Sequence, residues 1–223
     1  MVSNKLTHTS SLFDLNKLIH NALYPIQKQV LVYLVRNPRI GEKAIKHYLC
    51  PKVVIMAKEE IFPLVDEAGN LVGSATRKEC HSGSMLLHPV VHLHIFNSKG
   101  ELFLQKRSSL KDIQPGKWDT AVGGHIDLGE NVEMALRREA REELGIQEFD
   151  PTFNYTYLWE SSVERELVYS YRTIYEGPFQ IDPVELDEGR FWPMDEIEKQ
   201  LENDIFTGNF KKEFAMLKEL DLK

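Results

Sequence analysis

The spacing of glycines, glutamates and one arginine over Gly124–Ile146 constrains this chain more than any other feature of its sequence. The pattern predicts a helix over Asn131–Glu143, on which Glu139, Glu142 and Glu143 share one face because they stand at i, i+3 and i+4. Three carboxylates on one face repel one another, and a divalent cation would balance them. Because Mg²⁺ prefers oxygen ligands and keeps several waters, the pattern predicts a magnesium site with room for phosphate oxygens.

The residues that flank this helix agree with that interpretation. Gly145 follows the helix at the position where a glycine commonly ends one. Glu130 precedes it, where the helix dipole favours a negative charge. We expect Arg138 to anchor a carboxylate rather than to contact a substrate. A helix rich in Glu and Arg is often only a solvated face, but that interpretation explains neither the fixed glycines nor the loop spacing.

Strand patterns begin at Glu60 and mix with helical patterns to the end of the chain, which predicts an α/β sandwich. The predicted strands are Ile61–Val65, Leu71–Ala75, Val90–Phe96, Glu101–Gln105, Tyr155–Glu160 and Glu166–Tyr175, and the predicted closing helices are Asp195–Leu201 and Phe210–Leu220. In the third strand Val91, Leu93 and Ile95 alternate with His92 and His94, which sets one face for the core. We expect both histidines at the surface or beside a site.

Residues 1–55 differ from the rest in charge, with eight Lys/Arg against two Asp/Glu, whereas the remainder has 19 against 32. Helical spacing predicts short helices at Leu12–Asn21, Ile26–Arg36 and Gly41–Leu49. One interpretation is a basic helical N-terminal extension that docks on the following domain or on a partner. The alternative is that translation begins at Met56 and that the earlier segment is not native.

The pattern around the glutamate helix fits the Nudix box at all seven fixed positions, with only Ala140 small for an aliphatic position. The chain therefore resembles the Nudix superfamily. The resemblance implies a Nudix fold over residues 56–223, an α/β/α sandwich with a mixed β-sheet, and hydrolysis of a nucleoside diphosphate linked to another group. It also implies that Glu139, Glu142 and Glu143, with the Gly124 carbonyl, hold Mg²⁺ or Mn²⁺, and that one glutamate is the general base.

A second group of candidate ligands combines three histidines with two glutamates: His81, His88, His125, Glu164 and Glu166. Glu164 and Glu166 stand at i and i+2, which on a strand turns both side chains to one face. Three imidazoles and two carboxylates suit a transition metal or Mg²⁺ in octahedral geometry. The alternative is that the histidines make ordinary polar contacts and that the glutamates face solvent.

This group is similar to the metal site of bacterial isopentenyl-diphosphate isomerases, a branch of the Nudix superfamily, and the likeness covers roughly residues 61–192. The motifs that carry it are Leu87-His88, the Phe96-Asn97…Lys99-Gly100 turn, Leu104–Arg107, Pro115–Trp118 and Gly124-His125. The likeness implies a second divalent metal. One position departs from the isomerase pattern. The isomerases carry a cysteine two residues before the third histidine, where this chain has Gly123. Glycine has no group that donates or accepts a proton. We therefore expect a hydrolase, with the isomerase as the alternative.

Basic residues before the box form a candidate group for substrate phosphates: Lys106, Arg107, Lys111 and Lys117. They are equally consistent with a solvated loop. Trp118 and Trp192 either stack on a base or belong to the core. Glu185, Asp187 and Glu188 are expected in a loop where Nudix proteins often place an extra catalytic carboxylate.

Composition bears on the remaining function classes. No stretch approaches the roughly 20 apolar residues that span a bilayer. Cys50 and Cys80 are too few for a disulfide framework, which is typical of a reducing cytoplasm. The net charge of −7 argues against nucleic acid as the main partner. We expect a cytoplasmic enzyme for a small-molecule diphosphate, with no membrane partner, and a homodimer as Nudix proteins often are. A third alternative is a non-catalytic Nudix module, in which the domain senses a nucleotide or sugar diphosphate and the basic N-terminal helices relay the signal to a partner or to DNA.

Overall fold

A computed structural model describes residues 59–111, 113–182 and 185–220 of the chain. The strands are β1 (Ile61–Val65), β2 (Leu71–Thr76), β3 (Leu87–Phe96), β4 (Leu102–Arg107), β5 (Trp118–Asp119), β6 (Val122–His125), β7 (Thr152–Glu160), β8 (Arg165–Ile174) and β9 (Leu186–Trp192). The helices are α3 (Arg77–Cys80), α4 (Val132–Leu144), α5 (Met194–Gln200) and α6 (Gly208–Glu219). The helices predicted before residue 55 and the start at Met56 lie outside the described residues. No helix in the described part is long and apolar enough to cross a membrane.

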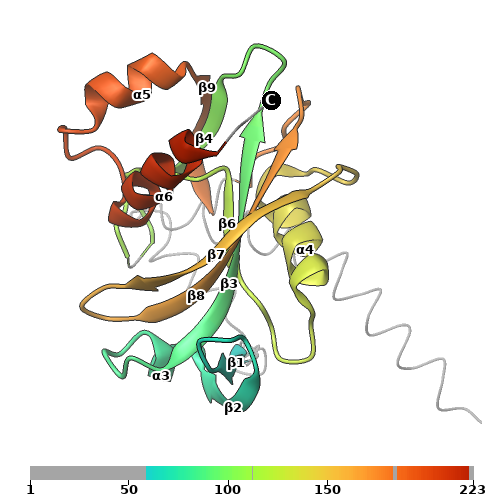
Figure 1. The fold of residues 1–223 in the computed structure, drawn as a ribbon, viewed down its shortest axis with the longest axis vertical. Helices are drawn as coiled ribbons and strands as arrows, with labels where there is room; N and C mark the ends of the chain where they lie inside the picture. Colours follow the sequence, from blue (N-terminus) through green and yellow to red (C-terminus); the bar gives the residue numbers. More distant parts are fainter. Residues whose placement is uncertain (1–58, 112, 183–184, 221–223) are drawn as a thin grey trace, which may run out of the picture. The chain divides into compact units, whose positions relative to one another are not determined.

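Seven of the strands form one mixed sheet, in which β5, β4, β3, β8 and β7 are neighbours in that order (Figure 1). β6 also pairs with β3, and β9 pairs with β4. β3 runs parallel to β8 from Leu87↔Arg165 to Phe96↔Ile174, whereas every other pairing in this sheet is antiparallel. β1 and β2 form a separate antiparallel hairpin. This pairing makes β3 the central strand of the sheet.

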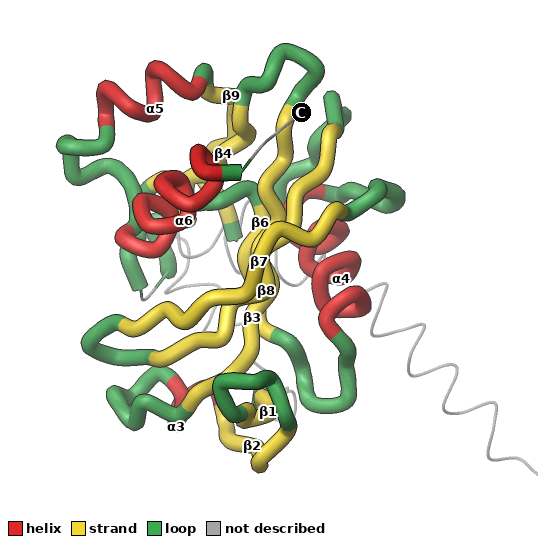
Figure 2. Tube along the Cα trace, viewed as in Figure 1, coloured by secondary structure: helices red, strands yellow, loops and turns green. Residues whose placement is uncertain are grey.

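Helices cover both faces of the sheet, α4 one face and α6 with α5 the other (Figure 2). On the first face Leu136 of α4 packs in one cluster with Leu93 of β3. On the second face Phe210 of α6 packs in a cluster with Leu104 of β4. Side chains alternate along a strand, so β3, β4 and β9 each contribute to both clusters. The predicted α/β/α sandwich with a mixed sheet is confirmed.

Because both faces are covered, all ten residues of β3 are buried. Val91, Leu93 and Ile95 lie in the cluster under α4, as their alternation predicts. His92 and His94 point to the other face and lie under α6, with exposed fractions of 7% and 0%. The predicted surface position is therefore wrong for both histidines. Alternating polar residues indicate a solvent-facing side only where nothing covers it, and here α6 does.

Glu213 of α6 is the partner that allows these two histidines to be buried. Its carboxylate accepts a hydrogen bond of 2.7 Å from His92 Nδ1 and lies 3.3 Å from His94 Nε2. Burial alone would lower the pKa of His92, but the charge and hydrogen bond of Glu213 raise it to about 9. Burial would likewise raise the pKa of Glu213, but the two histidines hold it well below its usual range. His92 and Glu213 therefore form an internal ion pair between β3 and α6.

Several strands differ from the sequence prediction: β5 and β6 were not predicted, and β7 begins at Thr152 rather than at Tyr155. β3 begins at Leu87 rather than at Val90, and the segment Leu186–Trp192 forms β9, which the sequence pattern did not indicate. Asp187 and Glu188 consequently lie on a strand paired with β4 and not in a loop. The reason is that β9 is held by its pairing with β4, while its own sequence contains charged residues and a glycine that are uncommon in strands.

We expect Glu213→Gln to lower the free energy of unfolding by about 3 kcal/mol, because it leaves the buried charge of His92 without its counter-ion. Urea unfolding followed by circular dichroism measures the change. Lys199→Ala is the control: it removes the exposed Asp195–Lys199 pair of α5 and should leave the urea midpoint unchanged. A Glu213→Gln protein as stable as the parent would show that the pair contributes nothing to stability.

The same ion pair predicts how this stability difference varies with pH. The pKa of His92 is raised from 6.5 to about 9, so its contribution is complete below pH 6.5 and is lost as the pH rises through 9. The pKa of Glu213 is lowered from 4.5, so its contribution is present above pH 4.5 and is lost as the pH falls. Urea unfolding of the parent and of Glu213→Gln should therefore differ most between pH 4.5 and 6.5 and should converge above pH 9.

Candidate active site

Local caps fix both ends of the box helix α4. At its start the Asn131 side chain accepts a hydrogen bond of 2.9 Å from the backbone N–H of Met134. At its end Gly145 adopts the left-handed conformation with a φ of 71°. These caps are encoded within a few residues of sequence, and they determine which side chains of the last helical turns face β6.

Arg138 joins α4 to the loop before it and to β6. Its guanidinium donates two hydrogen bonds of 2.8 Å to the Glu130 carboxylate. It also donates one of 2.7 Å to Glu139 and one of 2.9 Å to the backbone carbonyl of His125. The hydrogen bonds from Arg138 lower the pKa of Glu130. The prediction that Arg138 anchors a carboxylate is confirmed.

Glu139 lies directly against the backbone of β6, at a place that only a glycine leaves open. A Cβ atom at Gly124 would lie 2.1 Å from the Cδ atom of Glu139. Burial raises the pKa of Glu139 to about 7, although the neighbouring Arg138 acts in the opposite direction. The glycine at position 124 is therefore required by the close approach of this carboxylate.

Glu143 is the most enclosed of the three box carboxylates, Glu139, Glu142 and Glu143, with an exposed fraction of 6%. Its Oε2 atom accepts hydrogen bonds of 3.3 Å from the Gly123 backbone N–H and from Gln105 Nε2. Burial and the charge of Glu139 raise its pKa well above the usual range. Glu142 is half exposed and lies 3.5 Å from Arg138 Nη1. Gln105 lies in the Leu104–Arg107 motif, but no role for it followed from the sequence, because its contact with Glu143 follows from the pairing of β4 with the sheet.

The box carboxylates fit a hard divalent cation. Glu143 is buried and Glu139 is partly buried, and burial raises the pKa of both, so their environment lacks enough positive charge to hold them ionised. Arg138 contacts Glu139 but divides its hydrogen bonds between Glu139, Glu130 and a carbonyl. Carboxylate oxygens with too little positive charge around them suit a hard cation such as Mg²⁺ or Mn²⁺.

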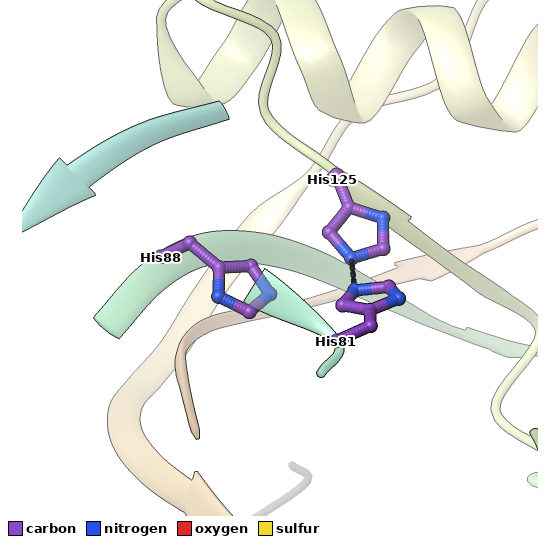
Figure 3. A group of neighbouring side chains, drawn as sticks. All are labelled: His81, His88 and His125. Carbon is purple, nitrogen blue, oxygen red and sulfur yellow. Dashed lines mark hydrogen bonds between the residues drawn. The ribbon is translucent and has the colours of Figure 1, made fainter. Parts of the chain in front are cut away.

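The histidine trio of His81, His88 and His125 lies on the other face of β6 (Figure 3). One ligand atom of each lies within 4.8 Å of the others. His81 Nε2 and His125 Nε2 are 3.0 Å apart. His88 donates from Nδ1 to the Leu86 carbonyl at 3.0 Å, and its buried Nε2 has no hydrogen-bond partner in the described part of the chain. The sequence prediction that these histidines group together is confirmed.

Burial lowers the pKa of all three histidines, of His81 to about 4. The trio is therefore neutral near pH 7, which is the form of imidazole that binds metal ions. The partnerless Nε2 of His88 is a free lone pair inside the group. These observations fit a divalent cation that accepts nitrogen ligands, such as Zn²⁺ or Mn²⁺.

The two predicted glutamate ligands are also placed beside the trio. Glu164 Oε2 lies 3.6 Å from His81 Nε2, and Glu166 is the cross-strand neighbour of His88 in the β3–β8 pairing. Both side chains are buried. Burial and the charge of Glu164 raise the pKa of Glu166 to about 8. The alternative that both glutamates face solvent is wrong.

Phe62 of β1 closes the trio from one side and had no signal in the sequence. Its ring is fully buried and stacks on the His125 ring with 4.2 Å between centroids and 4° between planes. It also stacks on the His88 ring with 5.6 Å between centroids. Phe62 thereby fixes the plane of His125 and keeps water from that side of the trio.

Three of the four basic residues predicted for phosphate binding pair with carboxylates. Arg107 lies 3.3 Å from Asp119. Its charge also acts to lower the pKa of Glu164 beside the histidine trio, but burial has the larger effect and raises that pKa. Lys117 pairs with Asp204 at 2.6 Å. In the described residues Lys106 forms no ion pair. Lys111 pairs closely with Glu185. Trp118 and Trp192 belong to the core cluster under α6.

A family model described as NUDIX domain matches residues 86–214. The chain therefore belongs to the Nudix family. It is 29% identical over 153 residues to an uncharacterized Nudix hydrolase of Yersinia pestis, covering 69% of this chain and 82% of that protein. It is 31% identical over 160 residues to isopentenyl-diphosphate Delta-isomerase 1 of Photorhabdus laumondii, covering 68% of this chain and 91% of that protein.

The fold agrees with this assignment. A crystal structure of a Deinococcus radiodurans protein matches with a TM-score of 0.61 at 23% identity, covering 70% of this chain and 98% of that one. A crystal structure of a MutT protein from Methanosarcina mazei matches with a TM-score of 0.53 at 23% identity, covering 61% and 96%. The family and the relatives named as Nudix hydrolases support an enzyme that hydrolyses pyrophosphate bonds.

We expect Gly124→Ala to weaken Mn²⁺ binding at the box by about tenfold or more, because the added methyl group displaces the Glu139 carboxylate. Isothermal titration calorimetry in a His88→Asn background measures this without a contribution from the trio. Gly73→Ala is the control, since a Cβ there meets only Leu64 Cδ1 at 3.8 Å. Unchanged Mn²⁺ affinity in Gly124→Ala would place the metal elsewhere.

Proposed function

We propose that the protein is a Mg²⁺-dependent Nudix hydrolase that cleaves a diphosphate linkage in a small molecule, a nucleoside diphosphate linked to another group or a related compound. The observation that carries this proposal is the pair of enclosed carboxylates, the partly buried Glu139 and the buried Glu143, held against the backbone of Gly124 and Gly123. A site of this kind concentrates negative charge that a cation and a phosphate chain can share.

Each box residue receives a distinct task in this proposal. Glu139, Glu142 and Glu143, with the Gly124 carbonyl, hold Mg²⁺ or Mn²⁺, which when bound neutralises charge on the diphosphate. Gln105 and the Gly123 N–H orient Glu143 through their hydrogen bonds. Glu142 is half exposed and so is the box carboxylate that a water molecule reaches most easily. One glutamate of the box set is the general base that removes a proton from the attacking water.

Substrate phosphates are assigned to Lys106, Arg107 and Lys117, on the basis of their charge and their place before the box. Lys106 is the best placed of the three to accept a phosphate, because in the described residues no carboxylate pairs with it. The expectations of a cytoplasmic protein and of no nucleic acid partner rest on composition, and that of a homodimer rests on the resemblance to Nudix proteins. The sensing module depends on residues 1–55, which lie outside the described part of the chain.

An isopentenyl-diphosphate isomerase is the second candidate function, and the histidine trio favours it. With Glu164 and Glu166 the trio supplies a second set of ligands for a divalent cation. Relatives named as isopentenyl-diphosphate isomerases support the same candidate. Gly123 opposes it, since it offers no proton donor at the position where the isomerase branch has a cysteine. The hydrolase is therefore the preferred proposal.

A panel of diphosphate compounds tests the proposal directly. Release of phosphate or of a nucleoside monophosphate in the presence of Mg²⁺ or Mn²⁺, and its loss with a chelator, is the expected result. The panel includes isopentenyl diphosphate, whose products are analysed by nuclear magnetic resonance. Rearrangement of that compound without cleavage would favour the isomerase, and inactivity on the whole panel would favour a sensing module.

We expect Glu142→Gln to reduce hydrolysis by at least about a hundredfold while leaving the melting temperature unchanged, because the side chain faces solvent and not the core. Steady-state rates on the best substrate of the panel measure the loss. Glu133→Gln is the matched control, since Glu133 is exposed on the same helix and pairs with Arg137. Near-normal turnover in Glu142→Gln would contradict the assignment of the box.

We expect Gly123→Cys to produce no isomerisation of isopentenyl diphosphate, measured by proton exchange into the product in deuterated water. A Cβ at this position lies 3.4 Å from the His92 ring, so the thiol meets an imidazole. Gly123→Ala is the control, because it adds the Cβ without the thiol. Isomerisation by the cysteine variant alone would show that the rest of the isomerase site is complete.

A further inference from the structure

Gln105 of β4 carries a buried amide whose two polar atoms differ in their surroundings. The residue has an exposed fraction of only 3%. Its Nε2 atom donates a hydrogen bond of 3.3 Å to Glu143 Oε2. Its Oε1 atom is buried and has no hydrogen-bond partner in the described part of the chain. A buried carbonyl oxygen without a donor destabilises a protein, so in native proteins such an atom commonly marks a place where water or a ligand binds.

The orientation of this amide follows from the neighbouring backbone of β6. The Gly123 N–H donates to the same Glu143 Oε2 atom, also at 3.3 Å. Because a backbone N–H can only donate, Oε2 acts as an acceptor, and Gln105 has to present its Nε2 atom to it. The atom of the amide left without a partner is therefore Oε1, an acceptor that requires a donor.

The strand neighbours of Gln105 offer no donor to this oxygen. Gly189 of β9 pairs with Gln105 on one side and has no side chain. Asp119 of β5 pairs with it on the other side. The Asp119 carboxylate accepts hydrogen bonds from the Thr120 N–H and the Thr207 hydroxyl, so it acts as an acceptor itself. The sheet therefore encloses Gln105 Oε1 without satisfying it.

Asn97 shows how a buried amide with a structural role is bonded in the same protein. It has an exposed fraction of 7% and lies in the turn between β3 and β4. Its Nδ2 atom donates to Glu101 at 2.7 Å, and its Oδ1 atom accepts from the backbone N–H groups of Lys99 and Glu101 at 3.0 and 2.9 Å. Both branches of that amide are used within the turn. Gln105 differs because one branch bonds a box carboxylate and the other bonds nothing in the described residues.

A divalent cation in the box would bring donors that suit this oxygen. Mg²⁺ bound by carboxylates keeps several waters, and a water on a cation is a strong hydrogen-bond donor. Groups that surround the ligands of a metal commonly bond to those ligands and change the affinity for the metal. Gln105 already bonds Glu143, one of the ligands proposed above, so the Oε1 atom of the same amide belongs to this surrounding layer.

We propose that Gln105 is a positioning residue of the box: its Nε2 atom holds Glu143, and its Oε1 atom accepts a hydrogen bond from a water molecule in the shell of the box cation. This inference rests on the proposed hydrolase function. It deepens that function by adding a residue, from outside the box helix, that fixes the position of water beside the box carboxylates.

Calorimetric titration of the full-length chain with Mn²⁺ tests this role, in a His88→Asn background that excludes the histidine trio. Gln105→Leu keeps the approximate size of the side chain and removes the acceptor, while the Gly123 N–H still holds Glu143. We expect Gln105→Leu to weaken Mn²⁺ binding by about tenfold. Gln147→Leu is the matched control, made at an exposed glutamine after the same helix, and it should leave the affinity unchanged.

Two further measurements separate this role from a structural one. The melting temperature of metal-free Gln105→Leu should equal or exceed that of the parent, because the change removes a buried oxygen that has no partner. Water on bound Mn²⁺ should exchange faster in Gln105→Leu, because it has lost its acceptor. Oxygen NMR relaxation at equal metal occupancy measures this exchange.

Equal Mn²⁺ affinity in Gln105→Leu, an equal loss in Gln147→Leu, unchanged water exchange or a lowered melting temperature would each overturn the role of Gln105. None of these results bears on whether the box hydrolyses a diphosphate. Absence of Mn²⁺ binding in the His88→Asn parent would instead contradict the hydrolase proposal itself, so the two failures are distinguishable.

Discussion

The close approach of strand β6 to helix α4 is the constraint on which both ligand groups depend. Three consecutive residues of β6, Gly123, Gly124 and His125, form contacts on the two faces of the sheet. Side chains alternate along the strand, so Gly124 faces the carboxylate of Glu139 while Gly123 and His125 face the opposite side. Arg138 fixes the spacing, because it bonds the His125 carbonyl and the Glu139 carboxylate at once. A side chain at position 124 would disturb the box carboxylates directly and the histidine trio through the backbone of β6.

The buried ionisable groups on either side of the sheet fall into two kinds, which differ in how their charges are balanced. His92 and Glu213 balance each other, so the pKa of His92 is raised and that of Glu213 is lowered, and the pair stabilises its own ionised form. In the box and beside the trio burial has the opposite outcome: the pKa values of Glu139 and Glu166 rise, and that of His81 falls. Burial drives these groups toward neutrality because their neighbours supply too little opposite charge; the Arg138 guanidinium beside Glu139, for example, is shared with Glu130. This is the state expected of ligands that await a cation.

Much of the fold and of the candidate site could be predicted from local patterns. The box helix was expected at Asn131–Glu143 and spans Val132–Leu144, because its two caps are set within a few residues of each end. Strand β9 was not predicted, since its sequence does not alternate and only its pairing with β4 makes it a strand. The predicted exposure of His92 and His94 failed because the chain gives no local sign that α6 returns to cover that face.

The sequence by itself determined the chemical groups and their local spacing: three glutamates on one helical face, a glycine where the helix ends, and five residues of the types that bind a second metal. Spacing along a helix or strand follows from backbone geometry, so it can be worked out without knowing the partners. Only the tertiary structure decided that the box and the trio lie on opposite faces of one strand. It also decided that Phe62 covers the trio and that Gln105 and Glu213 orient other side chains. Those contacts join segments far apart in the chain, so they depend on the complete tertiary fold.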